Sequence, residues 1–138
     1  MTHSPSCRRP AALRRSWMFV PGLDAAAQAA GLASGTDALV ADLEEFTAKV
    51  ERPAARPRIA ALFAECRAQG VVAAVRINKL EDDGMADLRG VMPGAPDAVF
   101  LPHAESAAQI AALDQAITAL EAELGLPSGS TEIVPTLE

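Results

Sequence analysis

The chain has 138 residues, a length that suits one compact domain better than two. Half of the residues are apolar, 22% are charged and 4% are aromatic, which excludes intrinsic disorder as the main state. The net charge of -6 provides no general attraction to nucleic acid or anionic lipid, so we expect a small-molecule ligand and neither nucleic acid nor a membrane as partner.

The sequence carries no signal for a membrane or for secretion. It lacks any apolar run near the roughly 20 residues that cross a bilayer, and it does not start with a signal-type apolar segment. Its cysteines, Cys7 and Cys66, are too isolated to suggest a disulfide scaffold or a zinc site. We therefore expect a cytoplasmic protein. Residues 1–14 are rich in arginine and contain no acid, so they are read either as a transit peptide or, more simply, as a disordered leader.

After the leader, short apolar runs alternate with segments of helical period. This alternation is typical of βα units and a parallel sheet, so the predicted fold class is α/β. In chain order we expect a strand at 16–20, a helix at 24–33, a strand at 38–43, a helix at 53–69, a strand at 71–78, a short helix at 85–91, a strand at 98–103, a helix at 106–124 and a strand at 133–137.

Polar side chains follow the apolar part of several predicted strands. Because the carboxyl ends of parallel strands share one rim, we expect these side chains to lie together where barrels and open α/β sheets build their ligand sites. The residues are Glu44, Glu45, Arg76, Asn78, His103, Glu105 and Glu138.

Two architectures fit this pattern. A five-stranded flavodoxin-like sheet suits the length, but it normally closes with a helix after its last strand. A (β/α)8 TIM barrel needs roughly 250 residues, so this chain would supply about its first five strands. The length favours the first architecture, and the final strand favours the second.

Six segments in order resemble one known family, the citrate lyase beta-subunit-like branch of the HpcH/HpaI aldolase/citrate lyase superfamily. Each motif is weak alone, but together they cover the chain from residue 15 at spacings that agree with successive βα units. The segments are RSWMFVPG at 15–22, DLEE at 42–45, PAAR at 53–56, VRIN at 75–78, LPHAESA at 101–107 and IVPTLE at 133–138.

The resemblance implies a TIM-barrel lyase, of which residues 15–138 would form the N-terminal part, truncated at strand 5. It implies a magnesium-dependent carbon–carbon lyase that works by aldol or retro-Claisen cleavage. The substrate would be a 3-hydroxy acid or its CoA thioester, such as citryl-, citramalyl- or malyl-CoA, and the protein would form trimers or hexamers. The alternative is a non-catalytic binding or assembly module derived from the same barrel.

The resemblance also assigns roles to single residues. Glu138 matches the family's first metal carboxylate and would bind Mg²⁺, for which oxygen ligands are suited. Arg76 matches the family's strand-end arginine and would hold the substrate carboxylate or thioester oxygen. Glu44 and Glu45 match a Glu-Asp pair beside the metal, where Glu44 would contact substrate and Glu45 would assist proton transfer; a solvated acidic turn is the other interpretation.

Three further residues are candidate substrate contacts. His103 stands where relatives carry a lysine, and we interpret it as a substrate contact rather than a metal ligand. Arg52 and Arg56 lie in the family's basic segment, where they would meet CoA phosphates or carboxylates, or else pair with neighbouring acids.

Overall fold

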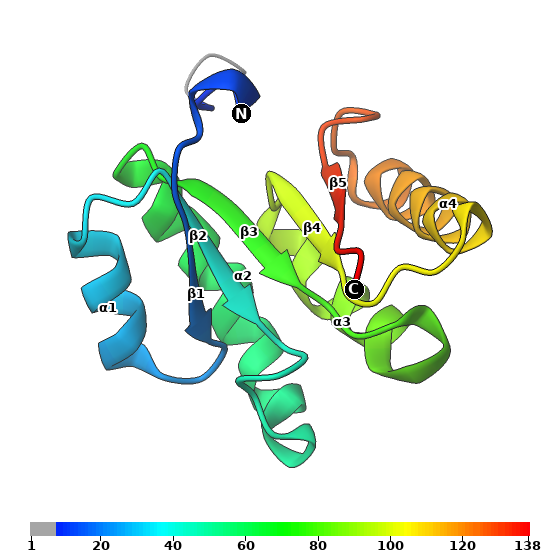
Figure 1. Ribbon diagram of the computed structural model, residues 1–138, viewed down its shortest axis with the longest axis horizontal. Helices are drawn as coiled ribbons and strands as arrows, with labels where there is room; N and C mark the ends of the chain where they lie inside the picture. The colour runs from blue at the N-terminus through cyan, green and yellow to red at the C-terminus, as the bar shows by residue number, and fades with distance from the viewer. Residues whose placement is uncertain (1–7) are drawn as a thin grey trace.

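The computed structural model describes residues 8–138, in which short strands alternate with helices (Figure 1). None of the helices in this range is both long and apolar enough to cross a membrane. The expected strands and helices are confirmed within a few residues of their predicted ends. In chain order the elements are η2 (Ala11–Leu13), β1 (Trp17–Pro21), α1 (Ala25–Ala33), β2 (Ala38–Asp42), η3 (Lys49–Glu51), α2 (Arg52–Ala68), β3 (Val72–Arg76), η4 (Leu80–Gly84), α3 (Met85–Val91), η5 (Met92–Gly94), β4 (Ala98–Leu101), α4 (Ala107–Leu124) and β5 (Glu132–Pro135).

The five strands form one parallel sheet in the sequential order β1-β2-β3-β4-β5. A flavodoxin-like sheet has the order 2-1-3-4-5, whereas the strands of a (β/α)8 barrel follow one another around the barrel in chain order. The sequential order therefore excludes the flavodoxin-like alternative and confirms the prediction of a partial TIM barrel.

Aromatic contacts across the sheet show how strongly it is curved. In a flat sheet, β1 and β4 would lie three strand spacings apart, about 14 Å. The ring centroids of Trp17 on β1 and Phe100 on β4 are nevertheless only 5.4 Å apart, and those of Phe19 and Phe100 are 5.6 Å apart. The strands thus curl around a concave inner face, which lies toward the viewer in Figure 1.

Apolar residues fill two separate layers, one on each side of the sheet. The larger core lies between the outer face and the helices, where α2 contributes Ile59, Leu62 and Phe63, all at most 1% exposed. The inner layer contains Ala74 and Ala98, whose small side chains leave room for the aromatic rings. Because the central strands are buried on both faces, their sequences are continuously apolar and do not alternate between apolar and polar residues.

Local signals in the sequence set the helix ends. Asp24 accepts a hydrogen bond from the N–H of Ala27 at the start of α1, and Ser106 accepts one from Gln109 at the start of α4. Gly125 ends α4 in the left-handed conformation, with φ of 70°. The two N-caps fix where α1 and α4 begin after β1 and β4, and Gly125 fixes where α4 ends.

The start of the chain lies at the amino ends of the strands. Residues 8–14, which we expected to belong to the leader, contact acidic side chains there. Residues 1–7, with Cys7, lie outside the described residues. The division of the chain at residue 15 stays a prediction.

We predict that Phe63→Ala lowers the free energy of unfolding by about 3 to 5 kcal/mol, because it leaves a cavity in the outer core. The measurement is urea unfolding followed by circular dichroism. Val50→Ala is the control, since Val50 is 86% exposed and its truncation should change stability by less than about 0.5 kcal/mol. Equal effects of the two variants would contradict the assignment of Phe63 to the core.

Candidate active site

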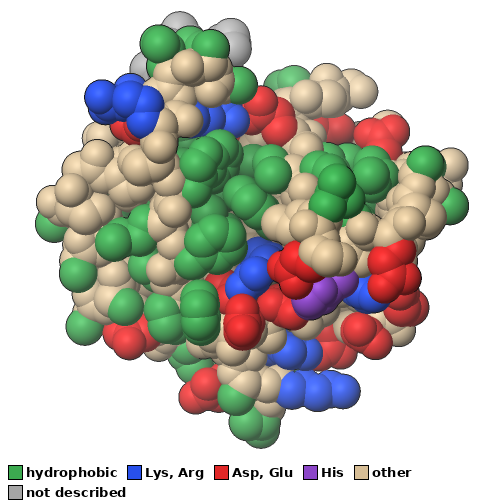
Figure 2. Space-filling view, in the orientation of Figure 1, with side chains coloured by type: hydrophobic (Ala, Val, Ile, Leu, Met, Phe, Trp, Pro, Cys, Tyr) green, Lys and Arg blue, Asp and Glu red, His purple; other side chains and the backbone are tan. Residues whose placement is uncertain are grey.

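Charged side chains from four strands meet at the carboxyl rim of the sheet. Figure 2 shows them as a cluster of acidic, basic and histidine side chains directly below the apolar inner face. Arg76 ends β3, Glu44 and Glu45 follow β2, His103 follows β4, and Glu138 follows β5. The structure thus brings together the five residues of the predicted rim that were given a role near the metal or the substrate, although those roles themselves stay predictions.

A buried ion pair between neighbouring strands forms the base of this cluster. Arg76 donates from Nε to Oδ1 of Asp42 at 2.8 Å and from Nη2 to Oδ2 at 2.7 Å. The two residues are register partners at the last positions of β2 and β3. The guanidinium also lies over the ring of Phe19, 4.9 Å from the ring centroid. The two hydrogen bonds to Asp42 and the contact with the Phe19 ring together fix the plane of the Arg76 guanidinium.

The pair keeps both partners charged. Burial alone would raise the pKa of Asp42, but the hydrogen bonds from Arg76 and from backbone N–H groups outweigh it and lower that pKa below 3.8. The hydrogen bonds to Asp42 raise the pKa of Arg76 above its ordinary value. Arg76 is therefore a permanent cation at the rim.

Asp42 also shapes the turn that carries the predicted acidic pair. Its carboxylate accepts hydrogen bonds from the N–H groups of Glu44, Glu45 and Phe46 at 3.0 to 3.3 Å. The hydroxyl of Thr47 donates to the Asp42 carbonyl oxygen at 2.7 Å. A single side chain thus fixes both the arginine and the loop beside it.

The turn brings the two glutamates to the same nitrogen of the guanidinium. Glu45 lies 3.3 Å and Glu44 lies 3.5 Å from Nη2 of Arg76. Glu44 is the more buried of the two, with a side chain 22% exposed against 67% for Glu45. Among the contacts of residues 8–138, no hydrogen bond occupies Nη1 of Arg76, so one side of the guanidinium has donors available for a ligand.

His103 connects the ends of β2 and β5. Its Nε2 lies 3.3 Å from Glu44 and its Nδ1 lies 3.0 Å from Glu138. The residue has φ of 49°, a left-handed conformation that few residues other than glycine adopt. The imidazole therefore lies between two carboxylates, at the position where relatives of the resembled family carry a lysine.

The donor set at the rim has the chemistry of a hard-cation site. Three carboxylates, from Glu44, Glu45 and Glu138, lie near Arg76 or His103, whereas the carboxylate of Asp42 is already occupied by Arg76 and the turn. Within residues 8–138, no group of three or more His, Cys, Asp or Glu side chains is placed to hold a metal ion by itself. Mg²⁺ commonly takes only one or two protein carboxylates and completes its octahedron with water and substrate oxygens, so these residues fit a partial magnesium site.

The two predicted cations of the basic segment are engaged in ion pairs. Arg52 donates to Asp83 at 2.9 Å and to the carbonyl oxygen of Glu44 at 3.2 Å, so it lies beside the rim. Arg56 donates to Asp87, which is fully buried, at 3.0 Å. The alternative that these arginines pair with acids agrees with these contacts. Their proposed contact with a substrate stays a prediction.

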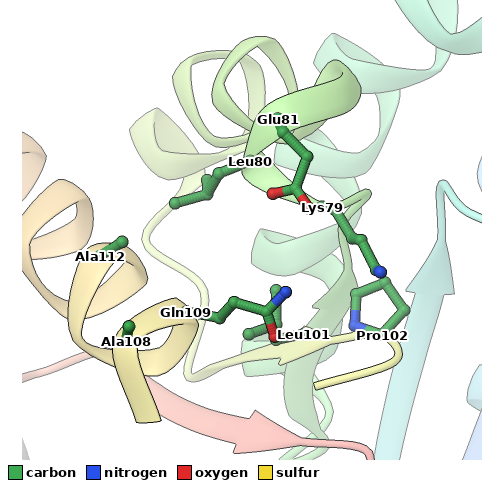
Figure 3. A pocket seen from close by; sticks show the side chains of 8 residues that line it. All are labelled: Lys79, Leu80, Glu81, Leu101, Pro102, Ala108, Gln109 and Ala112. Carbon is green, nitrogen blue, oxygen red and sulfur yellow. The ribbon is translucent and has the colours of Figure 1, made fainter. Parts of the chain in front are cut away.

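A small cavity opens at the outer side of the same rim (Figure 3). Its volume is about 220 Å³ and it lies between η4, the end of β4 and the start of α4. Its walls are mostly apolar, and the side chains of Lys79, Glu81 and Gln109 supply the polar groups. Pro102 lines the cavity and is followed directly by His103, so the cavity and the charged cluster flank the same turn.

Two features of the site escaped the sequence reasoning. The sequence predicts no role for Asp42 of the DLEE segment, although an aspartate that ends an apolar strand, next to a strand that ends in arginine, indicates an ion pair between the two strands. The turn η4 was also missed, because it depends on Gly84: a Cβ there would collide with the carbonyl oxygens of Asn78 and Lys79. Asn78 in turn donates to Asp87 and to the Leu43 carbonyl oxygen, which ties this turn to β2.

A protein-family model matches nearly the whole described chain. The model of the HpcH/HpaI aldolase/citrate lyase family matches residues 15–138. The citrate lyase subunit beta of Haemophilus influenzae is 34% identical over 127 residues, and that of Escherichia coli K12 is 31% identical over 132 residues. These alignments cover 91% and 95% of this chain but 44% of each relative, so the chain spans less than half the length of these proteins.

Two solved structures share the fold. A lead(II) complex of Haloferax volcanii malate synthase superposes with a TM-score of 0.64 at 18% identity, over 86% of this chain and 40% of that one. The citrate synthase SbnG superposes with a TM-score of 0.52 at 20% identity, over 76% of this chain and 38% of that one. At this identity the likeness supports the fold alone, and the partial coverage agrees with part of a larger barrel.

We predict that Asp42→Asn lowers the free energy of unfolding by about 2 to 3 kcal/mol, because it leaves the guanidinium of Arg76 without its buried partner. Asp42 has a lowered pKa in the folded state, so its contribution is complete above pH 3.8 and is lost as the pH falls through that lowered pKa. Urea unfolding between pH 7 and pH 3 should show the difference between wild type and variant shrinking at the acid end.

The matched control for this prediction is Asp114→Asn, an exposed aspartate on α4. It should unfold like the wild type across the same pH range. A pH-independent difference for Asp42→Asn, or none at neutral pH, would contradict the role of the ion pair.

Proposed function

Because this chain belongs to the HpcH/HpaI aldolase/citrate lyase family, we propose that the protein containing it is a magnesium-dependent carbon–carbon lyase. The proposed reaction is aldol or retro-Claisen cleavage of a 3-hydroxy acid or its CoA thioester, of the citryl-, citramalyl- or malyl-CoA kind. The observation that carries this proposal is the fixed guanidinium of Arg76 among the carboxylates of the rim.

Arg76 would bind the oxygen atoms of the substrate. Its Nε and Nη2 atoms are engaged by Asp42, so the side chain is oriented before any substrate arrives. The remaining donors would hold a carboxylate or a thioester carbonyl oxygen through charge-assisted hydrogen bonds. Such donors also stabilise the negative charge that develops on an enolate when the carbon–carbon bond breaks.

Glu138 would supply a carboxylate ligand for Mg²⁺. It lies 3.0 Å from Nδ1 of His103, and Glu44 lies 3.3 Å from Nε2 of the same ring, so the turn after β4 carries a side chain that contacts both carboxylates. When bound, the ion supplies Lewis-acid polarisation of the carboxylate and carbonyl oxygens of a 2-oxo acid fragment.

Glu45 would assist proton transfer. It is the most exposed of the three carboxylates around Arg76, and it lies 3.3 Å from the guanidinium that would hold the substrate. A carboxylate within hydrogen-bond reach of the substrate is placed to accept a proton from a hydroxyl group. His103, whose Nε2 lies 3.3 Å from Glu44, would also contact the substrate.

The cavity beside the rim would receive part of a thioester substrate. Its apolar walls suit the aliphatic segments of a thioester arm, and its polar groups suit amides: Lys79 donates, Glu81 accepts and Gln109 does both. Arg52 would add a cation between this cavity and the acidic turn, since it already donates to the Glu44 carbonyl oxygen.

The cellular setting is part of the same proposal. We place the protein in the cytoplasm as a homo-oligomer, a trimer or a hexamer, acting on a small molecule. The family supports a small-molecule substrate, and the charge of -6 gives no general attraction to nucleic acid.

We predict that Arg76→Ala and Glu138→Ala each lower kcat/KM for the cleaved acyl-CoA by about 100-fold or more in the natural protein. Assays would offer citryl-, citramalyl- and malyl-CoA with Mg²⁺ and after chelation with EDTA. Removal of the ion should abolish cleavage and its return should restore it.

The matched control is Arg89→Ala, an exposed arginine of α3 outside the rim, which should leave kcat/KM unchanged. Full activity in both rim variants would remove the catalytic assignment. A natural protein that binds the acyl-CoA but cleaves none of the three would favour a non-catalytic binding module.

A further inference from the structure

One fully buried aspartate has no role in the charged cluster at the rim. Asp87 is on α3, and its Oδ1 accepts a hydrogen bond from Nε of Arg56 on α2 at 3.0 Å. Its Oδ2 accepts two more from Asn78, one from the backbone N–H at 2.8 Å and one from Nδ2 at 2.9 Å. A buried carboxylate needs such partners, because burial removes its contacts with water. Asp87 therefore joins α2, α3 and the turn after β3.

Asn78 links Asp87 to the turn after β2. Its Nδ2 donates a second hydrogen bond, to the Leu43 carbonyl oxygen at 3.1 Å. Because Asp87 and Leu43 both present acceptor oxygens, the nitrogen of the Asn78 amide must face them, and this fixes the side chain in one orientation. Asn78 is only 6% exposed, so water does not supply a replacement acceptor.

The peptide unit between Leu43 and Glu44 is consequently held from both sides. Its carbonyl oxygen accepts from Asn78, and its N–H, which belongs to Glu44, donates to Oδ1 of Asp42 at 3.0 Å. The N–H of Leu43 donates to the Arg76 carbonyl oxygen at 2.9 Å, which ties the same backbone to the end of β3. A peptide plane whose two polar groups are both engaged cannot rotate without breaking a hydrogen bond. This plane sets the direction in which the Glu44 side chain leaves the backbone.

Close packing holds the Arg56 side chain beside Asp87. A Cβ on Gly90 of α3 would lie 2.6 Å from Cβ of Arg56, so α3 lies directly against that side chain. Arg56 is 16% exposed, and the carboxylate that it contacts is fully buried. These are the surroundings of a side chain that holds Asp87 in place. Strands β2 and β3, whose turns these contacts join, each pair with a strand on both sides.

We propose that Asp87 is a positioning residue for Glu44. Its carboxylate orients the Asn78 amide, and the amide fixes the peptide unit between Leu43 and Glu44. The Glu44 carboxylate is thereby kept 3.5 Å from Nη2 of Arg76. The effect on catalysis rests on the proposed function, whereas the effect on the turn does not.

Hydrogen exchange of the natural protein, measured by mass spectrometry, tests the effect on the turn. We expect Asp87→Asn to speed exchange in peptides that contain residues 43–47 about fivefold or more, with the peptides of β4 unchanged. Asn78→Ala should have the same effect. The double variant should exchange no faster than Asn78→Ala alone, because Asp87 acts through Asn78.

Glu121→Gln is the matched control. Glu121 is also a buried carboxylate that accepts three hydrogen bonds, but its donors lie in the loop before β5, at the amino end of the sheet. We expect this variant to unfold more easily than the wild type while residues 43–47 exchange at the wild-type rate. The comparison separates a positioning role from a general loss of stability.

Cleavage kinetics of the same variants separate the positioning role from the proposed function. Asp87→Asn should lower kcat about tenfold or more and change KM less than about twofold, since Asp42 still orients Arg76 for substrate binding. Faster exchange of the turn in a protein that cleaves no acyl-CoA supports the positioning role and removes the proposed function. Unchanged exchange in residues 43–47, unchanged kcat in an active protein, or an equal acceleration in Glu121→Gln overturns the positioning role.

Discussion

The buried pair between Asp42 and Arg76 is the interaction on which the rim of this sheet depends. Removing two charges from water is costly, and the cost is offset only where the geometry of the pair is good and further hydrogen bonds are made to the buried carboxylate. Here the carboxylate accepts two hydrogen bonds from the guanidinium and three from the following turn. The same side chain therefore orients the arginine and folds the acidic loop, so the two parts of the candidate site cannot move independently.

Small residues on the inner face accommodate the curvature of the sheet. Alanines at 74 and 98 leave room for Trp17, Phe19 and Phe100 to meet across the concave side, and the Phe19 ring lies beneath the guanidinium of Arg76. Larger side chains at those two positions would push the strands apart. The Phe19 ring shields one side of the guanidinium from water, and this strengthens the electrostatic attraction between the guanidinium and an anion that binds on the other side.

The sequence was sufficient to predict the strands, the helices and the residues that share the rim, because a continuous apolar run that ends in a charge marks the carboxyl end of a buried strand. It was not sufficient to predict which partners those charges would choose. Arg52 and Arg56 read equally well as free cations or as ion pairs, and only the placement of η4 and α3 supplies Asp83 and Asp87 as their partners. The arginine-rich composition at the start of the chain likewise did not indicate which residues it would contact, since Glu132 lies 118 residues away from Arg14 in the chain.

The excess of carboxylates at the rim determines which ligands can bind there more directly than any single residue does. Arg76 is largely neutralised by Asp42, while Glu44 and Glu45 lie 3.5 and 3.3 Å from its Nη2 and Glu138 lies 3.0 Å from Nδ1 of His103. An excess of carboxylates at one rim favours the binding of a cation there. The hydrogen bonds to Asp42 hold its pKa down, so protonation of the base of the cluster is disfavoured near neutral pH. Under the proposed function, a divalent cation with oxygen ligands would reduce the repulsion among these carboxylates without disturbing the Asp42–Arg76 pair, and it would leave the donors of Arg76 available to an anionic substrate.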